Sequence, residues 1–178
     1  MHEPPRTPTD RMGGMLPPGD RAALDRLTDR LDYPMLVVTA EAGGERAGCL
    51  VGFATQCSIH LPRFVLCLSR RNHTFRVAIR AGALVAHVLG PQDRALAALF
   101  GEQTGDAVDK FTRCRWRPGP GGPVLQACRQ WFAGRVLDRF DVGDHVAFLV
   151  EPFAAAAEPL EGQLGFQVVR GLRPGHPP

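Results

Sequence analysis

The sequence predicts a mainly β fold, namely an antiparallel β-barrel, closed or nearly closed, with few helices. Roughly six or seven segments carry the short apolar and β-branched runs typical of strands, whereas only about two or three short segments show helical spacing. A parallel sheet would need a helical crossover between most strands, and the chain lacks those helices. A barrel also removes exposed sheet edges, which favours the closed or nearly closed arrangement.

The N-terminal part of the chain predicts an arm, a helix and a hairpin. Residues 1–19 are rich in proline and polar residues, and we expect them to be disordered. Asp20 has a side chain suited to a helix N-cap, so a short helix should follow it. An apolar strand is expected over 35–40, and the Gly-Gly pair at 43–44 predicts a hairpin turn into a partner strand that begins near Arg46.

The middle of the chain predicts strand, helix and strand in turn. The run over 64–68 is rich in residues that favour strands, and the small and polar residues before it are expected to form a turn. Asn72 or Thr74 can cap the helix that follows, which should extend through Ile79. The next strand is expected over 84–89.

The C-terminal part predicts a second helix and the longest strands. The helix should begin at Gln92 or Asp93, because apolar residues follow at helical spacing. Two long strands are expected over 127–140 and 145–153, joined by a tight turn. A further short strand is expected near Phe166.

Length and composition indicate one globular domain, expected over 20–160, with a C-terminal extension over 161–178. A net charge of +3 and dispersed arginines argue against nucleic-acid binding. No apolar stretch approaches the ~20 residues that span a bilayer, so we expect no membrane association and a cytoplasmic location. The five cysteines include no C-x-x-C pair and the histidines are dispersed, so no metal site is expected.

Polar and basic residues cluster directly before the predicted helix of the middle region. They are Ser69, Arg70, Arg71, Asn72, His73 and Thr74. Free amides at a helix N-terminus attract anions, and arginine offers paired donors to a phosphate. The cluster therefore predicts a phosphate cradle, while the alternative interpretation is a plain helix cap beside solvated arginines.

Other candidate residues are isolated in the sequence. His145 opens a strand after a turn, where it could titrate near neutral pH, hydrogen-bond a ligand carboxamide or only cap the turn. Cys57 and Ser58 have no base near them in sequence, so we expect no nucleophilic site. Phe111 and the two tryptophans could stack on a ring, although core or interface positions also explain such aromatics.

Five segments of the chain carry a family resemblance through their order and spacing. They read PMLVVTA, GCLVGFATQCSIHLPRFVLCLSRRNHT, GALVAHVLGPQDRALAALF, DKF and GDHVAFLVEP. Over residues 31–153 the chain resembles the flavin reductase-like family of FMN-binding split barrels. The resemblance implies a split β-barrel of the FMN-binding type, antiparallel with Greek-key connections. It also implies a homodimer that binds flavin near the subunit interface.

The resemblance assigns particular residues to the cofactor. Residues 51–58 would line the flavin ring and ribityl chain, largely through backbone groups and Thr55. Phe111 would pack near the ring and His145 would face the nicotinamide. The phosphate would be held by Ser69, Asn72, His73 and Thr74. With Arg70 added from the local pattern, the candidate cofactor-binding residues are Val51, Gly52, Phe53, Ala54, Thr55, Cys57, Ser58, Ser69, Arg70, Asn72, His73, Thr74, Phe111 and His145.

The chain departs from the family pattern in two places. Leu50 and Gly52 stand where the family commonly has hydroxyl-bearing residues. The aromatic and basic run after the last barrel strand is also altered, over 164–170.

The activity implied is an NAD(P)H-dependent flavin reductase, which transfers hydride from a nicotinamide to FMN or FAD. Reduced flavin could then supply a partner monooxygenase. Because the flavin itself carries the chemistry, no catalytic side chain is expected. Two alternatives stay open: a flavoprotein or deazaflavin oxidoreductase that holds its cofactor tightly, and a non-catalytic protein that binds flavin or haem.

Overall fold

The structure is a computed structural model that describes residues 16–159 and 161–175. The chain divides into two units, 1–31 and 32–178. Most of the expected disordered arm falls on residues 1–15, outside the described residues. In the first unit, α1 (Pro18–Thr28) begins two residues before Asp20. Proline suits this first position, because its ring fixes a helical φ and it lacks the N–H that would go unpaired there.

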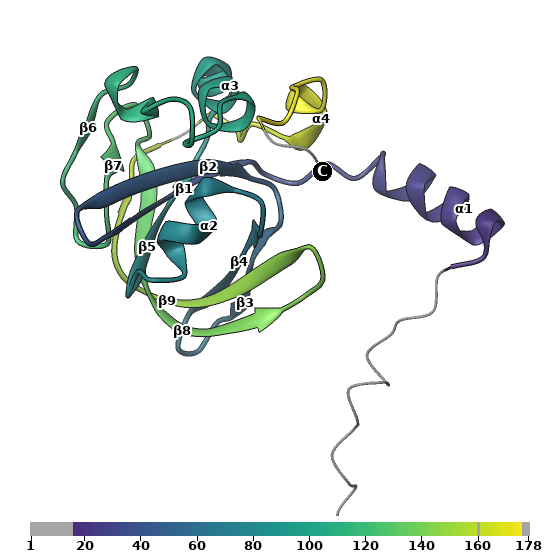
Figure 1. The fold of residues 1–178 in the computed structure, drawn as a ribbon, viewed down its shortest axis with the longest axis horizontal. Coiled ribbons are helices and arrows are strands. Elements are labelled where there is room, and N and C mark those ends of the chain that lie inside the picture. Colours follow the sequence, from purple (N-terminus) through teal and green to yellow (C-terminus); the bar gives the residue numbers. More distant parts are fainter. Residues whose placement is uncertain (1–15, 160, 176–178) are drawn as a thin grey trace, which may run out of the picture. The chain divides into compact units, whose positions relative to one another are not determined.

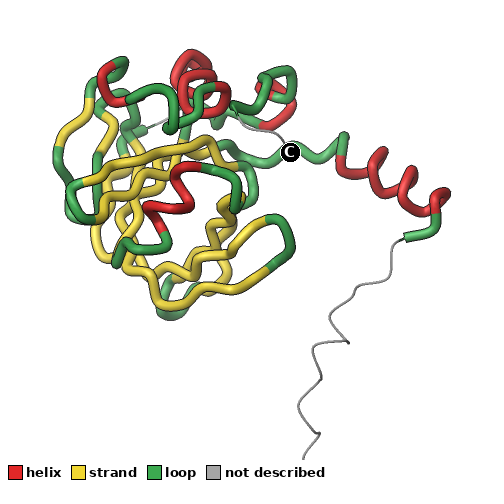
Figure 2. Tube along the Cα trace, in the orientation of Figure 1, coloured by secondary structure: helices red, strands yellow, loops and turns green. Residues whose placement is uncertain are grey.

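The second unit is built on a seven-stranded antiparallel sheet in the order β2-β1-β5-β8-β9-β4-β3 (Figure 1). Its strands are β1 (Leu36–Ala42), β2 (Glu45–Val51), β3 (Ala54–Ser58), β4 (Arg63–Ser69), β5 (Ala83–Val88), β8 (Gln130–Asp141) and β9 (His145–Ala157). The strands β6 (Trp116–Arg117) and β7 (Val124–Leu125) form a separate hairpin. The helices are α2 (His73–Ala78), α3 (Arg94–Glu102) and α4 (Phe166–Val169), with short 3₁₀ turns η2 (Pro91–Asp93) and η3 (Lys110–Thr112). Strands dominate this unit (Figure 2), which confirms the predicted mainly β, antiparallel fold with few helices.

The two edges of the sheet are consecutive in the chain. β2 is one edge and β3 the other, and only Gly52 and Phe53 separate the end of β2 from the start of β3. A residue spans at most ~3.6 Å, so this link holds the two strand ends within about 11 Å of each other. The sheet is therefore curled into a barrel that stays open along one line, since β2 and β3 do not pair. We call this opening, bridged by Gly52 and Phe53, the seam.

Apolar side chains pack on both faces of β1. Val38 lies in the barrel interior with Phe148 of β9 and Val77 of α2. Val37 belongs to a second core on the other side, together with Phe100 of α3. Because alternate residues of a strand face opposite sides, the uninterrupted apolar run of β1 reflects burial on both faces. Accordingly, α2 and α3 lie on opposite sides of β1 and β2 (Figure 1).

Two segments differ from the structure expected from the sequence. Residues 54–58, expected to form a turn, are edge strand β3; most of them are exposed, so they lack the apolar pattern of a buried strand. The prediction of a short strand near Phe166 is wrong, because this segment forms helix α4. The Asp32 carboxylate accepts a hydrogen bond from the Gln167 N–H at 2.9 Å. Such a bond satisfies a first-turn donor and so stabilises the start of a helix.

Candidate functional site

A cavity of about 460 Å³ opens at the seam, and we call it the first cavity. Gly52 and Phe53 line it from the link between β2 and β3, Ser69 from the end of β4, and His145 from the start of β9. The C-terminal segment forms a further wall, with Phe166, Val169, Arg170, Leu172 and Pro174. A concave site of this volume suits a cofactor-sized ligand.

The structure brings some of the candidate residues to this cavity and places others elsewhere. Those that line it are Val51, Gly52, Phe53, Ser69, Asn72 and His145. Those that do not are Ala54, Thr55, Cys57 and Ser58 on β3, and Arg70, His73, Thr74 and Phe111. The hydroxyls of Thr55 and Ser58 donate to carbonyls of their own strand and turn, those of Gln56 and His60.

Aromatic side chains form one end of the first cavity. Tyr33 stacks on Phe166 with 4.9 Å between ring centroids and lies 5.8 Å from the ring of Phe53. Phe53 also meets the edge of the His145 ring at 5.3 Å. Tyr33 and Phe166 were not predicted as site residues from the sequence. The available signal was that Tyr33 is the only tyrosine of the chain, next to the strand that carries the family resemblance.

The departures at Leu50 and Gly52 follow from packing around these aromatic residues. A Cβ at Gly52 would lie 2.6 Å from Cε2 of Tyr33, so any side chain there would have to displace the Tyr33 ring. Leu50 packs instead against Gly101 of α3, where an added Cβ would lie 3.0 Å from Cδ2 of Leu50. This end of the cavity is therefore apolar and aromatic where the family pattern has hydroxyls.

The residues before α2 serve different purposes. Asn72 lines the first cavity, and its Oδ1 accepts a hydrogen bond from the Thr74 N–H at 3.0 Å, which caps α2. The Thr74 side chain is buried and hydrogen-bonded to the thiol of Cys49. Burial raises the pKa of that thiol to about 11, so it stays protonated at neutral pH. Ser69 Oγ lines the same part of the cavity and accepts the Arg71 N–H at 3.4 Å.

Of the two arginines Arg70 and Arg170, only Arg170 lines the first cavity. Arg70 is bound to the turn between β8 and β9, with an ion pair to Asp141 at 2.7 Å and a hydrogen bond to the Gly143 carbonyl at 3.3 Å. Arg170 lines the first cavity from the segment after α4 and donates to Gln167 at 3.1 Å. Arg170 is thus a cationic residue of the cavity that the sequence did not single out.

His145 is oriented by its neighbour in sequence. Its Nδ1 lies 2.7 Å from the Asp144 carboxylate, and this hydrogen bond is the main cause that lowers the pKa of Asp144. When Nδ1 carries the hydrogen of that bond, Nε2 is left as the ring nitrogen for a ligand in the cavity. The geometry suits a hydrogen-bonding contact to a polar ligand group.

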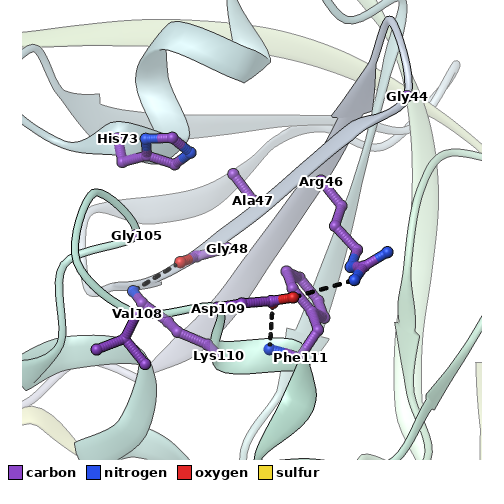
Figure 3. Close-up of a pocket in the computed structure, with 10 residues that line it drawn as sticks. All are labelled: Gly44, Arg46, Ala47, Gly48, His73, Gly105, Val108, Asp109, Lys110 and Phe111. Atoms are coloured by element: carbon purple, nitrogen blue, oxygen red, sulfur yellow. Dashed lines mark hydrogen bonds and ion pairs between the residues drawn. The ribbon is translucent and has the colours of Figure 1, made fainter.

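A second cavity, of about 260 Å³, lies on another part of the unit (Figure 3). His73 and Phe111, both candidate residues, line this second cavity rather than the first. The Phe111 ring packs edge-on against Phe100 and Trp116. His73 and Phe111 are therefore separated from the aromatic end of the first cavity.

Among residues 16–159 and 161–175, no helix has the length and apolar character needed to cross a membrane. Within the same ranges, no group of three or more His, Cys, Asp or Glu side chains is placed to hold a metal ion.

Comparisons with known proteins identify similar sequences and folds. The family model described as "Flavin reductase like domain" matches residues 28–167. The FMN reductase (NADH) RutF of Variovorax paradoxus (strain S110) is 28% identical over 128 residues, which cover 71% of each chain. The NADH:FAD oxidoreductase SgcE6 of Streptomyces globisporus C-1027 has a TM-score of 0.73 and 22% identity, over 86% of this chain and 90% of the other. A nitrilotriacetate monooxygenase component B from Mycobacterium thermoresistibile has a TM-score of 0.70 and 20% identity, over 79% and 77% of the two chains.

Proposed function

Because the chain belongs to the flavin reductase-like family, we propose that it reduces a free flavin, FMN or FAD, with a reduced nicotinamide nucleotide. The relative from Variovorax paradoxus is named an NADH-dependent FMN reductase, which makes NADH and FMN the first substrates to test. The observation that carries the proposal is the first cavity at the seam, which is lined both by aromatic residues and by the polar residues Ser69, Asn72 and Arg170.

The residues of the first cavity fit a phosphorylated flat cofactor. Tyr33, Phe53 and Phe166 offer apolar faces and edges to a ring. Ser69 and Arg170 supply a hydroxyl and a guanidinium, which are suitable partners for a phosphate. A flavin bound there would supply the chemistry, since its ring accepts hydride from a nicotinamide.

In this arrangement the protein binds and orients its ligands rather than acting as an acid or base. The aromatic residues would hold the ring and exclude water from one side of it. His145, fixed by Asp144, would present Nε2 to the nicotinamide carboxamide. Alignment of two bound ligands is itself a large catalytic factor.

The test is a turnover assay with purified protein, free FMN or FAD, and NADH or NADPH, followed by pyridine-nucleotide absorbance. We expect oxidation that depends on added flavin and saturates with it. A protein that retains a flavin through purification and shows no such dependence would be a flavoprotein or deazaflavin oxidoreductase or a binding protein instead. Absence of flavin affinity would contradict every flavin-based function.

The assembly and cellular setting belong to the same proposal. A homodimer is supported by the family, and β3 offers an unpaired edge with exposed apolar residues in the turn that follows it. A partner monooxygenase is supported by the name of the similar monooxygenase component B. The expected location is the cytoplasm, where NADH and free flavin are both supplied by metabolism.

A further inference from the structure

The second cavity contains a buried cation. Lys110, in η3, has only 3% of its surface exposed, and its Nζ donates to the carbonyls of Gly48 at 2.9 Å and Phe100 at 3.3 Å (Figure 3 shows the first of these bonds). An ammonium group has three N–H donors, so two bonds to neutral carbonyls leave one donor for another acceptor. No carboxylate of the described residues lies within 4.0 Å of this Nζ.

The acidic residue closest to Lys110 in sequence is already paired. Asp109 binds Arg46 at 3.1 Å, and its other oxygen accepts the Phe111 N–H at 3.0 Å. Arg46 also stacks over the Trp116 ring at 4.8 Å, which holds the guanidinium toward that side. This pair is neutral overall and supplies no counter-charge to Lys110, whose Nζ otherwise lies over the Phe100 ring at 5.5 Å.

His73 forms another wall of the cavity, and the charges around it are also paired. The His73 ring contacts Glu45 at 3.3 Å and Asp106 at 3.0 Å. Each of these carboxylates also pairs with an arginine, Glu45 with Arg80 and Asp106 with Arg76. The two carboxylates and two arginines of this wall cancel, so Lys110 leaves the net charge around the cavity positive.

We propose that the second cavity binds a small oxyanion, either a phosphate or a carboxylate, with Lys110 as its principal cation. Gly44 leaves open space at one wall, because a Cβ added there would have no neighbour within 4 Å. The volume of about 260 Å³ suits a small ligand and not a dinucleotide. A bound anion would offset the desolvation cost of the buried ammonium, which carbonyl dipoles meet only in part.

The alternative is that Lys110 only ties β2 to the end of α3 through its two carbonyl bonds. A matched pair of variants at Val108, which lines the same cavity, separates the two cases. The side chains introduced by Val108→Asp and Val108→Asn are nearly equal in size and differ in charge. Both variants keep Lys110. The measurement is calorimetric titration with inorganic phosphate, and separately with acetate, at constant ionic strength maintained with chloride.

For the unmodified chain we expect saturable binding of phosphate, acetate or both. Val108→Asp should weaken that binding by about tenfold or more, because its carboxylate would repel the anion and compete for the Lys110 ammonium. A tenfold change in affinity corresponds roughly to one charge-assisted hydrogen bond. Val108→Asn should retain the binding. Lys110→Met should abolish it, with thermal unfolding as the control for folding. No saturable binding by the unmodified chain, or equal affinities for both Val108 variants, would overturn the proposal. Val108 lines the second cavity and not the first, so a difference between the two Val108 variants locates the bound anion in the second cavity. The result therefore does not depend on what the first cavity binds.

Discussion

At the scale of single residues, the position of the Tyr33 ring depends on the absence of a side chain at Gly52. We expect Gly52→Ala to push the Tyr33 ring away from the seam, because the new Cβ would lie 2.6 Å from Cε2 of Tyr33. Overpacking of this kind costs about 1–3 kcal/mol, and flavin binding should weaken as well. Urea unfolding and flavin titration measure the two effects. Gly82→Ala is the control, since an added Cβ there has no neighbour within 4 Å; indistinguishable variants would contradict this role of Gly52.

For His145, substitution by alanine should raise the Michaelis constant for the nicotinamide and leave flavin affinity nearly unchanged. The side chain sits at the edge of Phe53 and is held by Asp144, so it contacts one part of the cavity only. Steady-state kinetics with each substrate varied in turn, beside direct flavin titration, separates the two parameters. A parallel loss of flavin affinity would show that the residue serves the ring instead.

His87 predicts a specific pH dependence of stability. It is fully buried between the Val37 carbonyl at 3.0 Å and the Leu125 N–H at 3.1 Å, and burial lowers the pKa of His87 from 6.5 to about 4. Between these values the unfolded chain binds a proton that the native state does not. The free energy of unfolding should therefore be intact above pH 6.5 and fall by about 3 kcal/mol as the pH approaches 4.

The variant His87→Gln tests this, because a glutamine amide can also donate and accept without titrating. Denaturant unfolding from pH 7 to 4 should give a flatter curve for the variant, even if its stability at neutral pH is lower. Asp106, whose pKa is lowered to about 2 chiefly by its hydrogen bond to Arg76, acts only at more acidic pH. An unchanged slope in the variant would exclude His87 as the cause.

The candidate phosphate cluster shows what local sequence can and cannot predict about a site. Consecutive residues at a helix start are rotated by about 100°. Asn72 therefore lines the first cavity, His73 the second, and Thr74 is buried. The sequence predicts that this turn borders a cavity. A run of polar residues does not show, however, which of their side chains point into the same cavity.

At the scale of elements, the C-terminal segment determines one wall of the first cavity. It is held by backbone bonds of Leu164 with Met35 and Leu89, and by the Asp32 carboxylate at the start of α4. The segment carries Phe166 and Arg170, an aromatic and a cationic residue that both line the first cavity. Its position should therefore control affinity for the whole flavin.

Substitution of Asp32 tests this control. Asp32→Ala removes the acceptor for the Gln167 N–H and should cost about 1 kcal/mol of stability, with weaker flavin binding as the wall loosens. Asp32→Asn keeps a carbonyl oxygen in place and should retain most of both properties. Thermal unfolding and flavin titration give the comparison. Equal flavin affinity in Asp32→Ala and the unmodified chain would show that α4 does not shape the cavity.

Helices and strands were predictable from the sequence where their buried faces require a regular pattern of apolar residues. β1 reads as a continuous apolar run because both its faces are covered, and the glycine pair at 43–44 marks its hairpin. β3 has no such pattern, since it is an exposed edge held by pairing with β4. α4 depends on Asp32, more than a hundred residues earlier, and no local window contains that contact.

At the scale of the whole molecule, the prediction concerns assembly. Ile59 and Leu61, in the turn after edge strand β3, are 78% and 67% exposed, an arrangement suited to a subunit interface. We expect a homodimer in sedimentation analysis, and Ile59→Asp should shift it toward monomer. Ile79→Asp, a similar change on an exposed residue at the end of α2, is the control. A monomeric unmodified chain would contradict the dimer directly.

The seam has a consequence for how the chain folds. β2 and β3 are neighbours in sequence, yet they cannot form a local hairpin, because they belong to opposite edges of the sheet. The single sheet that has them as its two edges requires the pairings of β5 with β8 and of β4 with β9, which join residues far apart in the chain. Non-local pairings of this kind slow folding. We therefore expect the ability to capture flavin to arise in the last, slowest refolding phase, together with the complete barrel and not with any partly folded species.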